Sequence, residues 1–143
     1  MPYEFLEDAA TADIAFRAWG ASLEEVFRAA SDATMNVMID NLDSIQYKDQ
    51  RSLQLENSAL DMLLFDLLQE LIYYKDAEQL LLRVREARIL QDQGEWRLTG
   101  LAQGEKLDPE RHQQRVDVKA VTLHHFQLEN TGQGWIASVI LDI

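Results

Sequence analysis

Two aspartates lie close to opposite ends of the sequence, each where a predicted strand begins or ends. Asp13 lies near the start of the alternating stretch TADIAFRAWG, and Asp142 directly follows the hydrophobic stretch WIASVIL at 135–141. The α-carboxylate of Ile143 follows directly, so the end of the chain holds two adjacent carboxyl groups. If the two strands are neighbours in a sheet, three carboxyl groups meet at one place.

Three carboxyl groups at one place are candidates for binding a cation. The three groups repel one another and are stable together only with a cation, or with some of them protonated. Oxygen ligands favour hard cations, so the set would suit Ca²⁺, Mg²⁺ or Mn²⁺. The spacing leaves two interpretations open, because it does not show that the strands are adjacent. Asp13, Asp142 and Ile143 are either metal ligands or unrelated residues at strand ends.

Other reactive arrangements are missing from the sequence. It has no glycine-rich phosphate loop, no serine in a G-x-S-x-G elbow and no cysteine for disulfides, zinc binding or thiol catalysis. The histidines, His112, His124 and His125, are each expected at the surface or at a strand edge. His124 and His125 would point to opposite faces of a regular strand, so they are not expected to bind one metal together.

The composition is that of an ordinary soluble globular protein. The 143 residues suit one domain, spanning 1–143, with 47% hydrophobic and 27% charged residues. The net charge is −12 and there is no long Lys/Arg run, so direct nucleic-acid binding is not expected. A basic partner or a metal fits this charge better. With no signal-peptide pattern and no apolar run of about 20 residues, we expect a cytoplasmic protein without a membrane segment.

Two main helices are predicted, at about 22–39 and 58–75. Ser22, with Glu25 three residues later, forms a capping box that would start the first helix. The same pattern, Ser58 followed by an aspartate three residues on, would start the second helix. The second helix is apolar on more than one face, which predicts a central, mostly buried helix packed against a sheet.

The remaining elements are predicted to be strands. Residues 44–57 suggest a strand or a short hairpin, and residues 77–90 favour a strand over a helix. The residues of the first segment expected to face inward are Ile45, Tyr47, Leu53 and Leu55. The last two strands are joined by the hairpin loop NTGQG. The order is β-α-β-α followed by several strands. This order predicts an α+β fold, with a mixed or antiparallel β-sheet packed against the two main helices.

Taken together, several stretches resemble the archease family over nearly the whole chain. The resemblance rests on an ordered set of motifs rather than on one distinctive piece: Thr11-Ala12-Asp13-Ile14, Gly20, Ser22-Leu23-Glu24-Glu25, GEKLD at 104–108, His112, VKAVT at 118–122, His124 and the closing LDI. Two positions depart from the family pattern. Ala10 stands where the family usually has a histidine, and His125 stands where it often has an acidic residue.

The resemblance implies an accessory protein rather than a stand-alone enzyme. Archeases assist the RtcB-type RNA ligase of tRNA splicing and RNA repair, promoting its GTP-dependent guanylylation and multiple turnover. The family carries a divalent-metal site, seen with calcium, whose ligands correspond to Asp13, Asp142 and Ile143. Lys106 and Lys119 match lysine positions of the family and, with the matching His124, are candidates for the same functional surface.

Two alternatives of another class remain: a stand-alone metal-binding chaperone and a small metal-dependent hydrolase. The sequence offers no nucleophile–base pair and no general base beside the carboxylates, which argues against the hydrolase. It shows no evident Met-rich or broad apolar surface of the kind a general chaperone would use, although the second helix could hide one. The expected function is therefore activation of the ligase by a protein without catalytic residues.

Overall fold

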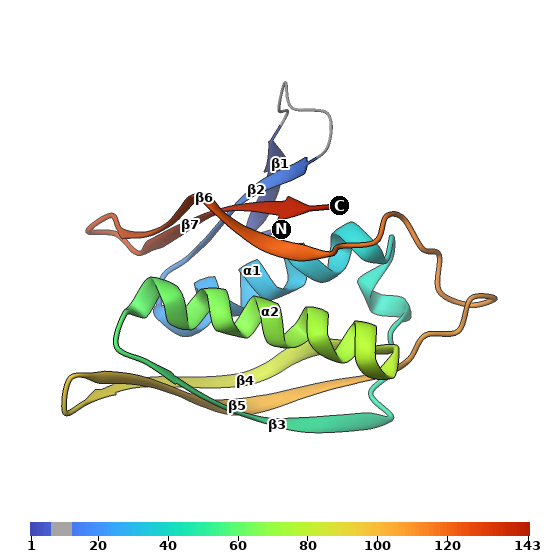
Figure 1. Cartoon of the computed structure of the whole chain (residues 1–143), viewed down its shortest axis with the longest axis horizontal. Helices are drawn as coiled ribbons and strands as arrows, with labels where there is room; N and C mark the ends of the chain where they lie inside the picture. The colour runs from blue at the N-terminus through green and yellow to red at the C-terminus, as the bar shows by residue number, and fades with distance from the viewer. Residues whose placement is uncertain (7–12) are drawn as a thin grey trace.

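Two antiparallel sheets enclose two helices (Figure 1). The computed structural model describes residues 1–6 and 13–143. One sheet has the strand order β1-β2-β7-β6 and the other has the order β3-β5-β4. The elements are β1 (Tyr3–Leu6), β2 (Asp13–Gly20), α1 (Leu23–Met38), the 3-10 helix η1 (Leu42–Ser44), β3 (Asp49–Asn57), α2 (Leu60–Glu78), β4 (Leu80–Asp92), β5 (Glu95–Lys106), β6 (Ala120–Asn130) and β7 (Trp135–Asp142).

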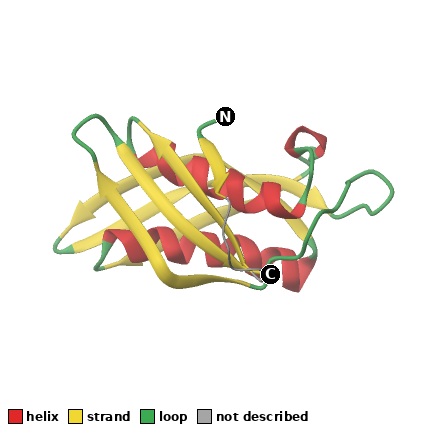
Figure 2. Cartoon of the chain, turned by 90° about the horizontal axis from the view of Figure 1, so that it is seen from above, coloured by secondary structure: helices red, strands yellow, loops and turns green. Residues whose placement is uncertain are grey.

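The predicted α+β class with two main helices is confirmed. Every described strand pair is antiparallel, and the strands are divided between two sheets rather than gathered in one. Figure 2 shows the two helices side by side, with strands crossing them obliquely. No helix within the described residues is both long and apolar enough to cross a membrane.

The first helix, α1, begins where the sequence predicts. The Ser22 hydroxyl accepts a hydrogen bond from the Glu25 N–H at 3.2 Å, as an N-cap residue should. The Glu25 carboxylate reaches back to the Ala21 N–H at 2.6 Å, one residue earlier than in the usual capping box. Local side chains therefore accept from one N–H in the first turn of the helix and from one N–H just before it.

The second helix, α2, begins two residues later than predicted and without the predicted capping box. Ala59 occupies the N-cap position, and no side chain caps it. The Asn57 side-chain oxygen accepts from the Ala59 N–H at 3.0 Å, while Asp61 accepts from the N–H of its neighbour Met62. The assignment of Ser58 as the cap was therefore wrong, because Asn57 at the end of β3 shapes the turn instead.

The core lies between the two sheets, and both helices contribute to it. The prediction that the second helix is mostly buried was wrong, because 6 of the 19 residues of α2 are buried, against 11 of the 16 residues of α1. The buried residues of α2 pack against strands of both sheets, which confirms the predicted packing against a sheet. Burial of each such side chain is worth roughly 1.5–3 kcal/mol relative to exposure. The buried residues of this helix are Leu63, Leu64, Leu67, Leu68, Leu71 and Ile72.

Two short segments differ from the sequence-based prediction. Tyr3–Leu6 forms β1, which the sequence did not reveal, because four residues are too few to show a clear alternation. Of the strand or hairpin expected over 44–57, the structure forms the single strand β3, preceded by a coil in which Tyr47 is 40% exposed. Tyr47 points outward because it stacks with Arg85 of β4, whose guanidinium lies 4.3 Å from the ring centre.

Candidate functional site

The strands of Asp13 and Asp142 are adjacent. β2 and β7 pair in antiparallel register, and Asp13 lies directly opposite Asp142. Directly opposed residues project from the same face of a sheet, with Cβ atoms about 4.5–5.5 Å apart. Both residues are partly exposed. The structural condition for a shared site is therefore met, and we call these two residues the carboxylate pair.

The carboxylate pair supplies only part of a metal coordination shell. Within the described residues, no three side chains of His, Asp or Glu gather closely enough to hold an ion. Ca²⁺ takes 6–8 oxygen ligands and Mg²⁺ or Mn²⁺ about six, so other oxygens must complete the shell. Ile143, the third predicted ligand, follows Asp142 directly and packs partly buried against the core. The donor chemistry fits a hard divalent cation.

Lys119 lies at the same end of the sheet as the carboxylate pair. Its backbone N–H donates to the Asp142 carbonyl at 2.8 Å, and the next residue, Ala120, lies opposite Asp142 in the β6–β7 pairing. The Lys119 side chain is exposed. Of the residues predicted for the functional surface, Lys119 is the one that this sheet end brings beside the pair.

Lys106 and His124 lie elsewhere. Lys106 is the last residue of β5 in the other sheet, where its ammonium lies 3.4 Å from the Glu78 carbonyl at the end of α2. His124 lies in the middle of β6, away from the strand end that pairs with Asp142. Ala10 and the Thr11-Ala12 part of the family motif fall outside the described residues.

A long connection, the strap (residues 107–119), leads from β5 to Lys119 (orange, at the right of Figure 1). Its middle pairs with the end of α1: the Asp40 N–H donates to the Gln113 carbonyl at 2.9 Å, and the Arg115 N–H donates to the Met38 carbonyl at 2.8 Å. These backbone bonds hold the strap along the helix end, so its course is defined although it has little regular structure.

A buried network fixes the beginning of the strap. His112 is 1% exposed and Glu105 is 3% exposed, which corrects the expectation of a surface or edge position for His112. The Asp108 N–H donates to Nδ1 of His112 at 2.9 Å, so Nε2 carries the proton and donates to Glu105 at 2.9 Å. The guanidinium of Arg111 lies 2.5 Å from the other oxygen of the same carboxylate.

The charge of Glu105 is stabilised despite its burial. Burial by itself would raise its pKa, but hydrogen bonds from Arg111, the Gln46 N–H and His112 outweigh that effect and hold the pKa at about 2. A buried carboxylate with three donors is ionised throughout the physiological range. The network therefore joins the strap firmly to β5 and to the segment before β3.

A second contact holds the end of the strap next to Lys119. The Lys75 ammonium, on a side chain 12% exposed, contacts the carboxylates of Asp117 and Asp76 and donates to the Val118 carbonyl at 3.2 Å. Burial lowers the pKa of Lys75, but the hydrogen bonds to the two aspartates outweigh it and raise the pKa above its usual value. Lys75 thus fixes the backbone immediately before Lys119.

The two adjacent histidines share a bulge instead of opposite strand faces. His125 has φ = 54°, in the left-handed region, and the β6–β7 register shifts between Thr122 and Gln127. The bulge turns the two rings toward each other, with centroids 4.0 Å apart, and both residues are exposed. The prediction that His124 and His125 point to opposite faces was therefore wrong, because it assumed a regular strand.

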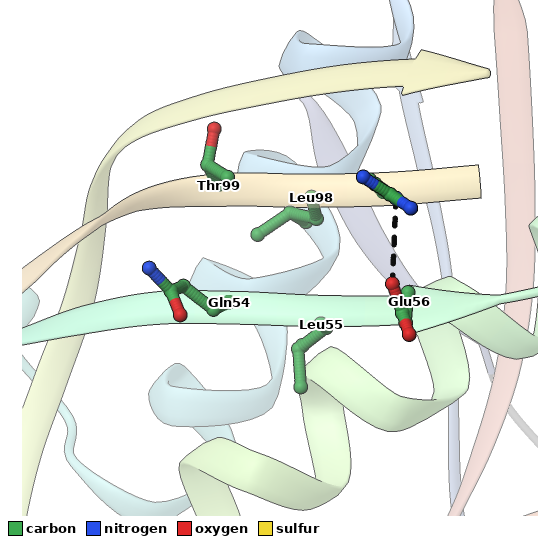
Figure 3. A pocket seen from close by; sticks show the side chains of 6 residues that line it. Gln54, Leu55, Glu56, Leu98 and Thr99 are labelled. Atoms are coloured by element: carbon green, nitrogen blue, oxygen red, sulfur yellow. Dashed lines mark ion pairs between the residues drawn. The ribbon is translucent and has the colours of Figure 1, made fainter. Parts of the chain in front are cut away.

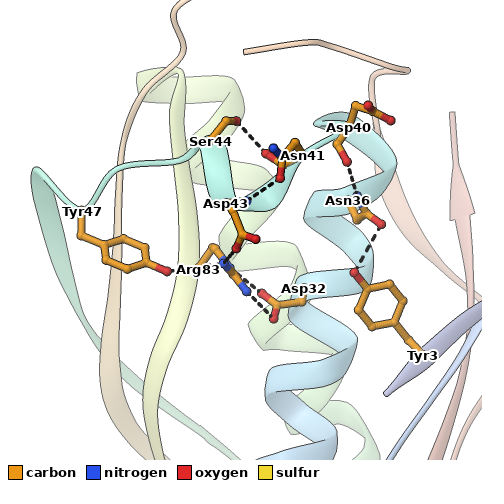
Figure 4. Close-up of polar contacts among 9 residues, drawn as sticks. All are labelled: Tyr3, Asp32, Asn36, Asp40, Asn41, Asp43, Ser44, Tyr47 and Arg83. Atoms are coloured by element: carbon orange, nitrogen blue, oxygen red, sulfur yellow. Dashed lines mark hydrogen bonds and ion pairs between the residues drawn. The ribbon is translucent and has the colours of Figure 1, made fainter. Parts of the chain in front are cut away.

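Arg83 forms a polar cluster that the sequence did not reveal (Figure 4). Its guanidinium pairs with both Asp32 oxygens at 3.1 and 3.0 Å, and lies 3.4 Å from both Asp43 and the Tyr47 hydroxyl. The hydrogen bonds with Asp32 raise the pKa of Arg83, although burial opposes them. These contacts join β4 to α1 and η1, so the cluster stabilises the packing of these three elements.

A hollow of about 440 Å³ lies on the outside of β3 and β5 (Figure 3). Gln54, Glu56, Arg97 and Thr99 line it, and Arg97 pairs with Glu56 at 3.4 Å. It belongs to the three-stranded sheet, whereas the carboxylate pair belongs to the four-stranded sheet. Because it is an open polar sheet face with a neutralised charge pair, it offers no arrangement suited to catalysis.

Comparison with known proteins matches the chain to one family. The model of the Archease protein family (MTH1598/TM1083) covers residues 3–143. The chain is 38% identical to protein archease of Pyrococcus abyssi over 134 residues, covering 93% of this chain and 94% of the relative. It is 39% identical to protein archease of Methanosarcina mazei over 142 residues, covering 99% and 95%.

Two solved structures share the fold. Protein 1598 of Methanobacterium thermoautotrophicum superposes with a TM-score of 0.85 at 34% identity, over 99% of both chains. A Thermotoga maritima protein described as an archease and possible chaperone superposes with a TM-score of 0.62 at 19% identity, over 96% of both chains, and shows the fold alone. With the family model matched from Tyr3 to Ile143, the chain belongs to the archease family.

Proposed function

We propose that this chain is an accessory factor that activates an RtcB-type RNA ligase, promoting its GTP-dependent guanylylation and multiple turnover in tRNA splicing or RNA repair. Membership of the archease family supports the proposal. The observation that carries it is the pairing of Asp13 with Asp142, since the family resemblance assigns the metal ligands to these residues and the fold brings them together.

In this proposal the carboxylate pair and the terminal carboxylate of Ile143 hold a divalent cation. Ca²⁺ is the first candidate, with Mg²⁺ or Mn²⁺ as alternatives, because all three prefer oxygen ligands. The bound ion would offset the mutual repulsion of these carboxyl groups and so hold this end of the sheet together. The chain itself contributes the ligands and their rigid placement at the end of two hydrogen-bonded strands.

The surrounding residues suit a helper protein better than an enzyme. In the described part of the chain, no nucleophile–base pair lies beside the carboxylate pair; its nearest strap neighbour is Lys119, fixed by its backbone bond to Asp142. A net charge of −12 would favour encounter with a basic surface, and such complementarity speeds association more than it tightens binding. We therefore assign no catalytic residue to this chain.

The test is the rate of ligase guanylylation with GTP, with and without this protein. Asp13→Ala should abolish the stimulation while leaving the circular-dichroism spectrum and melting temperature close to those of the wild type. Asp92→Ala is the matched control, because Asp92 is an exposed strand-end aspartate in the other sheet. Full stimulation by the Asp13→Ala variant would refute the assignment of the site.

The role of Ile143 has its own test. Residues appended after Ile143 replace its terminal carboxylate by a peptide carbonyl, which should weaken Ca²⁺ binding measured by isothermal titration calorimetry by about 10-fold, or roughly 1.4 kcal/mol. The same peptide appended before Met1 is the control. Equal Ca²⁺ affinity of the two tagged proteins would remove Ile143 from the ligand set.

A free-standing chaperone is the second candidate, favoured by the description of the Thermotoga maritima protein. It predicts that this chain suppresses the aggregation of unrelated unfolded proteins. Ligase activation instead predicts faster guanylylation and no such suppression. Suppression of aggregation without any effect on guanylylation would support the chaperone function and refute ligase activation.

A further inference from the structure

One long side of α2 is covered by neither sheet (Figure 1). Tyr73 on this side is 59% exposed, Asp61 is exposed, and Phe65, Asp66 and Glu70 are partly exposed. These five residues form the outer face of α2. The outer face thus combines an exposed aromatic ring with three carboxylates.

Beside this face, the strand β6 contacts α2 at two points. The Val121 N–H donates to the Gln69 side-chain oxygen at 3.0 Å, and the Phe126 ring meets the Phe65 ring edge to face at 5.6 Å. Along α2, Phe65 and Gln69 are one helical turn apart, or about 6 Å. Along β6, the five residue steps from Val121 to Phe126 would extend about 16 Å in a regular strand. The excess chain between the two contacts must therefore bulge away from the sheet.

This β6 bulge (residues 123–126) displays its side chains outward. On β7, Ile140 faces Thr122 and Ser138 faces Gln127, so five residue steps on one strand oppose two on the other. Leu123 is 60% exposed, and the adjacent rings of His124 and His125, tilted by 49° to each other, are exposed next to it. Bulges often redirect side chains at functional surfaces, and this one leaves the apolar Leu123 exposed between two residues that contact α2.

The charge of the combined surface has one sign. Residues 60–74 of α2 and 120–130 of β6 contain no Lys or Arg, while Asp61, Asp66 and Glu70 carry negative charge. Within the described residues, none of these three carboxylates forms an ion pair; Asp66 accepts a hydrogen bond from the neutral Asn57 amide. The surface therefore attracts cations, because no Lys or Arg of the described residues pairs with its three carboxylates.

The chain itself shows which cation such a surface recognises. One turn further along α2, the Arg51 guanidinium lies 5.8 Å from the centre of the Tyr74 ring and 2.7 Å from the Glu78 carboxylate. Arginine suits this pairing because its flat guanidinium stacks on an aromatic ring while binding a carboxylate. Tyr73 and Glu70 offer the same combination of ring and carboxylate to an external arginine.

We propose that the outer face of α2 and the β6 bulge form a docking surface for an arginine-bearing segment of the partner protein. The arginine stacks on Tyr73 and pairs with Glu70, while Leu123 covers an apolar side chain beside it. The proposal rests on the proposed function, since the partner is the ligase that this chain activates. Docking on this surface is then separate from the action of the carboxylate pair.

The experiment measures the affinity for an RtcB-type ligase by biolayer interferometry and, with the same proteins, the rate of ligase guanylylation. Glu70→Arg and Leu123→Ser should each raise the Kd at least 10-fold, and should recover full stimulation once the concentration exceeds the new Kd. Two controls match them: Leu90→Ser, also 60% exposed but on β4, and Glu86→Arg, exposed on the same strand. The controls should change the Kd less than 2-fold.

The results separate the two proposals. Unchanged affinity of Glu70→Arg and Leu123→Ser, with a wild type that stimulates guanylylation, overturns the docking surface and leaves the proposed function in place. Weakened binding by these variants, with a wild type that binds but does not stimulate, supports the docking surface and overturns the proposed function. A wild type that neither binds nor stimulates overturns both.

Discussion

A single buried carboxylate, that of Glu105, receives hydrogen bonds from three donors in two separate segments. Two of the donors, Arg111 and His112, belong to the strap, and the third, the Gln46 N–H, precedes β3. Burying such a charge is favourable only while its partners remain in place, because an unpaired buried charge is costly. Glu105 therefore makes the course of the strap depend on one ionisable group.

That dependence predicts a loss of stability at acid pH. The folded-state pKa of Glu105, about 2, lies below its usual value of 4.5, so its contribution is complete above that usual value and is lost as the pH falls toward 2. Glu105→Gln should lower the free energy of unfolding at pH 7 by roughly 2 kcal/mol. Urea unfolding measured between pH 7 and pH 2 should show a smaller acid-induced loss in this variant. An equal loss in both proteins would contradict the account.

His125 allows a second test at the scale of one residue. Its φ of 54° is strained for a residue with a side chain but not for glycine. His125→Gly should therefore keep or raise the free energy of unfolding, by up to about 1 kcal/mol. His124→Gly, whose φ is not positive, should lower it by roughly 0.5–1 kcal/mol. Thermal denaturation of the two variants checks the sign of each change, and an equal destabilisation by both would rule out the strained bulge.

The strap shows at the level of an element what sequence patterns do and do not predict. The residues KLDPERH predict a loop, because the proline disfavours a helical residue before it, and a loop is found from Leu107 onward, after Lys106 at the end of β5. The burial of His112 could not be predicted, because it depends on Glu105 and on the Asp108 N–H, which come together only in the folded chain. Position in a loop suggests exposure unless such partners are known.

For the helices and strands too, features that depend on nearby residues could be predicted from the sequence, and features that depend on distant contacts could not. The Ser22 cap of α1 was predictable because its partner is three residues away. The start of α2 and the β6 bulge were not, since the first depends on Asn57 at the end of β3 and the second on two contacts with α2. The pairing of Asp13 with Asp142 could be proposed from the sequence, but only the sheet order establishes it.

Lys75 gives a test of the strap as an element. Lys75→Met removes the ammonium that holds Asp117 and the Val118 carbonyl, so the chain before Lys119 should open more often. Hydrogen exchange of the Lys119 amide, which donates to Asp142, should become about 10-fold faster, corresponding to roughly 1.4 kcal/mol of lost local stability. Lys106→Met, the same change at an exposed lysine of β5, should leave that rate unchanged. Equal exchange in the Lys75 variant and the wild type would contradict a positioning role for Lys75.

At the scale of the whole molecule, the pairing of β2 with β7 brings the early and the last parts of the sequence together at one sheet end. A cation bound there would join both strands and so stabilise the folded state against the unfolded chain. Ca²⁺ at 100 times its Kd should add about 2.7 kcal/mol to the free energy of unfolding. For a chain of 143 residues this raises the melting temperature by roughly 5–10 °C. Asp142→Asn should abolish the rise, and a rise of the same size in this variant would place the ion elsewhere.

The central claim, that the carboxylate pair holds a divalent cation, can be tested most directly by NMR with Mn²⁺. A paramagnetic ion broadens the amide signals nearest to it, and sub-stoichiometric Mn²⁺ identifies the site in one titration of the ¹⁵N-labelled protein. The account predicts that the amides of Asp13, Ala120 and Asp142 broaden first, and that excess Ca²⁺ restores them. Broadening centred on Asp32 and Asp43, or on the two bulge histidines, would contradict it, and so would the absence of any selective broadening.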